Sequence, residues 1–141
     1  MEAPPALAQK VFTAKELKVI EKTVGPYFDA TTAAVIAGDY ETAKIKLIVT
    51  REYLARSWTF WNMNRQAEAA KMVSAAVATL DTLDDLLSAT TVDADAVRSA
   101  VTQAAAACTA CHAAFRVQDP MTKAYGIKPG VIAEAARPQS N

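Results

Sequence analysis

The segment KMVSAAVATLDTLDDLL, residues 71–87, decides the fold. Its apolar side chains recur at steps of three or four residues: Val73, Ala76, Val77, Leu80, Leu83 and Leu87. In an α-helix this spacing places them along one face, while the aspartates and threonines between them fall on the other. The pattern predicts an amphipathic helix that buries one side against other helices.

Another helix is predicted from Thr13 onward. Thr13 and Glu16 have the spacing of a capping box, in which each side chain bonds to the backbone N–H of the other residue. Gly25 and Pro26 interrupt the apolar stripe that follows, because proline lacks the N–H that an interior helical residue donates. We therefore expect a kink or two abutting helices at this point.

Two more helices carry similar signals. Gly38 is suited to end the first helix and Asp39 to cap the next, which runs to about Trp61. The last helix starts near Thr90–Asp93 and loses its periodicity after about Val117. Four amphipathic helices joined by short links favour antiparallel packing of neighbours.

The predicted fold is therefore all-α, an antiparallel up-down-up-down four-helix bundle with an irregular C-terminal tail. We expect residues 1–12 to be an N-terminal extension, residues 13–119 the bundle and residues 120–141 the tail. One turn of helix is expected in the tail, at Val131–Ala136. No stretch has the pattern of a convincing strand, so no sheet is expected.

Charge and hydropathy exclude several classes of function. The 141 residues include 15 Lys and Arg and 15 Asp and Glu, so there is no general positive field to hold nucleic acid or an anionic membrane. No run of about eighteen apolar residues occurs, so no membrane span is expected. The first residues lack the charged and apolar regions of a signal peptide, which leaves a cytoplasmic chain or one whose signal peptide has been removed.

Both cysteines and the only histidine lie within five residues, in Cys108-Thr109-Ala110-Cys111-His112. On a helix, residues three and four apart project from one face. Two thiols on one face can add to the two vinyl groups along one edge of a porphyrin, and the adjacent imidazole can bind the iron. The motif therefore predicts one covalent haem c, attached through Cys108 and Cys111, with His112 as the proximal iron ligand.

Two cysteines and a histidine at this spacing also occur in sites without haem. A structural zinc site needs four ligands, and the chain has no further Cys or His. A thioredoxin-like pair sits at a helix N-terminus after a strand, whereas this pair falls late in a helix. Two buried cysteines beside a chance histidine remain as the alternative to haem.

The segment CTACHAAFR, residues 108–116, resembles the class II c-type cytochromes, the cytochrome c′ group. Their pattern is CxxCH, two further residues, an aromatic residue and an arginine, and here Phe115 stands where Tyr is usual. The resemblance implies a periplasmic electron-transfer protein whose signal peptide has been removed. It also implies a homodimer formed through the first two helices, which the apolar residues Ile45, Ile48, Val49 and Tyr53 would suit.

The predicted topology brings the end of the last helix beside the start of the first helix and the corner after the second. We therefore expect the following side chains to contact the haem: Leu17, Ile20, Glu21, Val24, Phe28, Trp58, Trp61 and Met63. Arg116 is assigned to the proximal side or to a haem propionate. Other basic side chains near this end could pair with the propionates: Arg51, Arg56, Arg65 and Lys71.

The distal side of the iron separates the possible functions. In the family it resembles, the distal residue comes from the first helix, which here contains no Met. We expect an apolar distal face, with Val24 or Phe28 nearest the iron, and hence an open site able to bind NO or CO. The alternative is a six-coordinate electron carrier in which Met63 or Met72 is the sixth ligand.

We expect a haem protein of electron transfer or gas binding rather than an enzyme. A peroxidase needs a distal acid–base group, and the single His112 is already used on the proximal side. Glu21 is the only other candidate near the haem, so the residues favour a peroxidase least. An electron carrier requires a redox partner protein, whose identity the residues do not specify.

Overall fold

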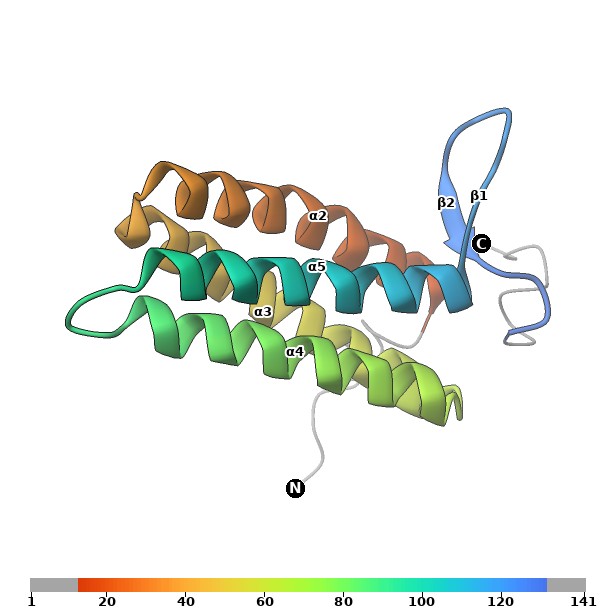
Figure 1. Cartoon of the computed structure of the whole chain (residues 1–141). Coiled ribbons are helices and arrows are strands. Elements are labelled where there is room, and N and C mark those ends of the chain that lie inside the picture. Colours follow the sequence, from red (N-terminus) through yellow and green to blue (C-terminus); the bar gives the residue numbers. More distant parts are fainter. Residues whose placement is uncertain (1–12, 132–141) are drawn as a thin grey trace, which may run out of the picture.

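The computed structural model describes residues 13–131, which form four helices followed by a short hairpin (Figure 1). The elements are α2 (Ala14–Ala37), α3 (Tyr40–Met63), α4 (Ala67–Leu87), α5 (Ala94–Phe115), β1 (Arg116–Gln118) and β2 (Tyr125–Ile127). Each helix packs against the next in the chain, and α2 and α5 close the bundle with the sparsest packing of the four side-by-side pairs. The predicted all-α four-helix bundle is confirmed.

Local capping fixes the helix ends at the predicted residues. The Thr13 hydroxyl accepts the backbone N–H of Glu16 at 3.1 Å. Gly38 ends α2 with φ of 74°, a left-handed conformation that glycine adopts without steric cost. The carboxylates of Asp39 and Asp93 accept backbone N–H groups in the first turns of α3 and α5. These four signals act within a few residues and were therefore readable in the sequence.

Pro26 lies inside α2, which continues as one helix from Ala14 to Ala37. The expectation of two abutting helices is therefore wrong. Gly25 and Pro26 are both exposed, so the carbonyl of Lys22, which loses its usual helical partner at Pro26, is on the solvent side. Packing of the buried face of α2 holds the helix together across this point.

The segment after α5 is an antiparallel hairpin rather than a wholly irregular tail, and the expectation of no sheet is wrong there. Arg116 pairs with Ile127 and Gln118 with Tyr125 in the ladder. The Asp119 carboxylate accepts two backbone N–H groups in the connecting turn. The helix therefore ends at Phe115 and not near residue 117. The helical turn expected at Val131–Ala136 falls, except for Val131, outside the described residues.

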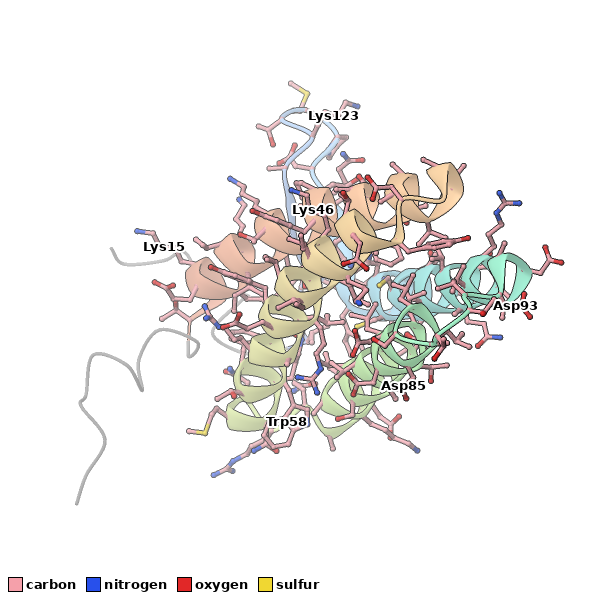
Figure 2. The ribbon with its side chains drawn as sticks, turned by 90° about the vertical axis from the view of Figure 1, so that its left-hand side faces the viewer. Lys15, Lys46, Trp58, Asp85, Asp93 and Lys123 are labelled. Carbon is pink, nitrogen blue, oxygen red and sulfur yellow. The ribbon has the colours of Figure 1, made fainter. Side chains whose placement is uncertain are left out.

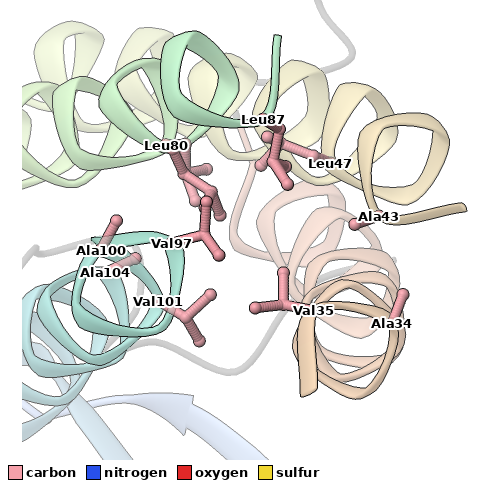
Figure 3. Packing of buried hydrophobic residues seen from close by; sticks show 11 residues of the cluster. Ala34, Val35, Ala43, Leu47, Leu80, Leu87, Val97, Ala100, Val101 and Ala104 are labelled. Carbon is pink, nitrogen blue, oxygen red and sulfur yellow. The ribbon is translucent and has the colours of Figure 1, made fainter. Parts of the chain in front are cut away.

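The core is divided between the two ends of the bundle. At the end away from the hairpin, all four helices bury small and medium apolar side chains, among them Val35, Leu47, Leu80 and Val97 (Figure 3). At the other end a second cluster contains Leu17, Phe60, Trp61, Ala69, Ala70 and Val73. No helix in residues 13–131 is long and apolar enough to cross a membrane.

Candidate functional site

The last two turns of α5 carry Cys108, Cys111 and His112. Both cysteines are free thiols and partly buried, and the His112 side chain keeps 33% of its surface exposed. All three side chains line one cavity of about 200 Å³ inside the bundle, which we call the inner cavity. The helical spacing of three and four residues thus brings the two thiols and the imidazole to one space.

The wall of the inner cavity is mostly apolar and comes from all four helices. Apart from the α5 residues just named, its apolar lining consists of Val24, Phe28, Leu54, Trp61, Met72, Val73 and Ala76. Ser57 is the hydroxyl residue in the wall, and its Oγ donates to the carbonyl of Leu54 at 2.6 Å. Two acidic residues of α2, Glu21 and the exposed Asp29, also line the inner cavity. The remaining wall suits a large apolar group.

A larger space, which we call the outer groove, opens on the other side of His112. It has a volume of about 840 Å³ and lies between the first turns of α2, the end of α5 and the hairpin. Its lining includes five basic residues: Lys15, Lys18, Lys22, Arg116 and Lys123. Lys15 and Lys123 extend outward from α2 and from the hairpin (Figure 2). The groove therefore has a cationic rim.

The inner cavity and the outer groove adjoin at a shared set of residues. These are Glu21, Gly25, Trp61, Cys111, His112 and Arg116. Arg116 is held by stacking, with its guanidinium carbon 3.8 Å from the ring centroid of Tyr125. The hairpin was not predicted from the sequence, yet it positions Arg116, which was predicted as a site residue.

Of the two acidic residues in the inner cavity, Glu21 is the one that lies beside the imidazole and acts on both thiols. Its Oε2 lies 3.5 Å from Nε2 of His112. Burial raises the pKa of Cys108 and raises that of Cys111 to about 11, and the negative charge of Glu21 adds to both shifts. Both cysteines are therefore protonated thiols near neutral pH.

Two predicted contact residues lie away from this site. Trp58 is 41% exposed on the outer surface of α3 (Figure 2) and lines neither space. The buried stripe of α3 passes through Ser57 instead, one residue away and about 100° around the helix. Ile20 is buried but also lines neither space.

The remaining predictions divide in the same way. Val24, Phe28, Trp61 and Arg116 line the inner cavity, and so does Met72. Leu17 lines the outer groove. Met63 is 54% exposed and lines neither space.

The other basic residues expected near the propionates lie elsewhere. Arg51 pairs with Asp81 at 2.7 Å and Arg56 with Glu52 at 2.9 Å. Arg65 and Lys71 line neither the inner cavity nor the outer groove. The lysines that do line the groove were missed, although Lys15, Lys18 and Lys22 follow the three-and-four spacing of one helix face.

Comparisons with protein-family models, with curated proteins and with solved structures find no match to this chain. Within residues 13–131, no group of three or more His, Cys, Asp or Glu side chains could hold a metal ion. The function is therefore argued from the chemistry of the site.

Proposed function

We propose that this chain is a single-haem c-type cytochrome of the class II kind. Haem c would be attached through Cys108 and Cys111, with His112 as the iron ligand. The observation that carries the proposal is that these three side chains line one mostly apolar cavity, which adjoins a groove with a cationic rim. Two free thiols and one imidazole in such a place match the donor set of a covalently held haem.

The two adjoining spaces match the two kinds of surface on a haem. The macrocycle is apolar, and the wall around Phe28 and Trp61 offers apolar contact. The propionates are anionic, and the lysines of the outer groove offer opposite charge. Small-molecule sites usually measure about 300–1,000 Å³, a range that includes the groove but not the inner cavity alone. We infer that the haem uses both spaces.

Each residue of the site has a defined task in this proposal. Cys108 and Cys111 would each add S–H across a vinyl double bond, forming a thioether without loss of electrons. His112 would bind the iron, and Val24 and Phe28 would keep water from the distal side. When bound, haem supplies a one-electron couple between ferric and ferrous iron.

We infer electron transfer or binding of a small gas such as NO or CO, not an enzymatic reaction. The single histidine is used as a ligand, so a distal imidazole that could serve as acid and base is missing from the chain. An apolar distal side leaves one coordination position open to a neutral diatomic molecule. Covalent haem attachment implies a periplasmic location and a redox partner protein there.

A second candidate is a six-coordinate electron carrier with Met72 as the other axial ligand. Met72 lines the inner cavity from α4, while Met63 is exposed and does not. Thioether ligation raises the reduction potential of a haem and suits electron transfer. This observation keeps Met72 as the alternative and removes support from Met63.

A homodimer remains part of the proposal. Ile45 and Ile48 are exposed on α3 and Ile36 is exposed near the end of α2. A second copy of the chain could cover these apolar side chains. Sedimentation velocity on the haem-loaded protein, with Ile48→Glu as the variant, should show a dimer that the variant weakens. A wild-type monomer at high concentration would contradict it.

The proposal is tested by producing the chain with a haem-maturation system. We expect a red protein whose mass exceeds that of the polypeptide by one haem. The double variant Cys108→Ser, Cys111→Ser should lose the covalent haem, while Thr109→Ser, which lies between the cysteines, should keep it. A colourless wild-type protein with only the polypeptide mass would contradict the proposal.

The absorption spectrum of the same protein separates the two coordination states. Binding of CO by the reduced protein, without a far-red methionine–iron band in the oxidised one, would support the open site. The far-red band without CO binding would support Met72 as ligand.

A further inference from the structure

Glu21 is the only acidic residue that lines both the inner cavity and the outer groove in the described part of the chain. It lies on the face of α2 that turns toward α5, one turn before Val24 and one turn after Leu17, both of which are buried. Its carboxylate keeps about a third of its surface exposed, as the His112 side chain does. Glu21 therefore belongs to the boundary between the two spaces.

The carboxylate is close to the atom of His112 that points away from the backbone. Oε2 of Glu21 lies 3.5 Å from Nε2 of His112, and no hydrogen bond joins the two side chains. Among residues 13–131, His112 is the only basic side chain with a nitrogen within 4 Å of the Glu21 carboxylate. The lysines of the groove line the same space without pairing with Glu21, so no lysine in the described residues neutralises its charge by direct contact.

From this contact we propose that Glu21 is the charged group that selects ligands at the iron. The inference rests on the proposed function, because it requires iron at Nε2 of His112. A negative charge beside the metal repels incoming anions and leaves neutral diatomic molecules almost unaffected. The site would thus favour neutral gases over anionic ligands. The same charge stabilises ferric iron more than ferrous iron, because ferric haem carries one more positive charge.

Glu21→Gln removes the charge with little change in size. Glu41→Gln is the matched control, because Glu41 is exposed in the first turn of α3, at the end of the bundle away from the site. Glu21→Asp keeps the charge and serves as the conservative variant. Covalent haem is first measured by mass in every variant, so that failure of haem attachment is detected separately from any change in ligand binding.

Two affinities are then measured on each haem-loaded protein: azide for the ferric form and CO for the ferrous form. In Glu21→Gln we expect azide affinity to rise about tenfold while CO affinity stays within about twofold, because only the anion interacts with the lost charge. At a fixed potential the ferrous-to-ferric ratio should also rise about tenfold, which corresponds to about 59 mV for one electron. Glu21→Asp and Glu41→Gln should stay near the wild-type ratio of azide to CO affinity.

Equal changes in azide and CO affinity would overturn the inference, because they would indicate a general change of pocket shape. No change in either affinity would overturn it as well. A wild-type protein that carries haem but binds neither probe would also overturn it, while leaving the covalent haem site intact.

Discussion

Trp61 and Trp58 are the two tryptophans of the chain, and the structure predicts a large loss of stability on removal of Trp61 and a small one on removal of Trp58. Trp61 is 4% exposed, packs edge-on against Phe60 with ring centroids 5.1 Å apart, and lies 5.4 Å from the ring of Phe115. Replacing a buried Trp by Ala typically costs about 3–5 kcal/mol. The two aromatic contacts, each about 0.5–1.5 kcal/mol, place Trp61→Ala in the upper half of that range.

Trp58→Ala is the internal control, because it removes the same side chain three residues earlier on α3. Its effect should stay within about 1 kcal/mol, as expected for an exposed position. The assay is urea unfolding of the haem-free protein followed by far-ultraviolet circular dichroism. With a urea slope of about 2 kcal/mol/M, Trp61→Ala should lower the midpoint by about 2 M and Trp58→Ala by less than about 0.5 M. A larger shift for Trp58→Ala would refute this assignment of the buried face of α3.

Three further predictions concern the site. Near neutral pH, iodoacetamide should alkylate Cys111 about a hundredfold more slowly in the folded haem-free protein than in the urea-unfolded chain. The reason is that burial raises the pKa of Cys111 to about 11 and only the thiolate reacts. Equal alkylation rates would contradict this prediction. Met72→Leu should remove any far-red methionine–iron band from the oxidised haem protein, and Met63→Leu should not. Of these two methionines, only Met72 lines the inner cavity. Loss of the band in Met63→Leu would assign the ligand to Met63 instead. Gly25→Ala should change the stability by less than about 1 kcal/mol, because an added Cβ meets no atom within 4 Å beyond its chain neighbours and alanine favours a helix, while that Cβ crowds the ring of Pro26. Gly25→Leu should reduce haem incorporation by filling shared space; normal haem content in Gly25→Leu, measured by absorbance per polypeptide, would argue against haem in that space.

The helices, their caps and the grouping of Cys108, Cys111 and His112 could be predicted because each depends on residues close in the sequence. The capping hydroxyl of Thr13 and the left-handed Gly38 act within four residues of their partners. The periodicity of residues 71–87 needs only the helix repeat, and the same repeat groups Cys108 with His112. For features of this range the sequence and the structure agree.

The hairpin and the face of α3 could not be predicted, because tertiary contacts determine them. The two strands have three residues each and no apolar pattern of their own, and their ladder is supported by the stacking of Arg116 on Tyr125. Hydropathy favours Trp58 for the buried stripe, yet the small Ser57 takes the buried position and satisfies its hydroxyl within the helix. Neither outcome has a strong local signal.

The position of the candidate site follows from how unevenly the helices pack. Among the four pairs of helices that lie side by side, α2 and α5 pack most sparsely, and the residues shared by the two spaces come mainly from these two helices. Gly25 contributes no side chain to this seam. Well-packed interiors leave few voids larger than a water molecule, so a cavity of about 200 Å³ beside two thiols and an imidazole favours a space kept for a ligand over incidental looseness. The same seam brings Glu21 of α2 next to His112 of α5, so in our proposal the iron ligand and the charge that would tune it depend on one pair of helices.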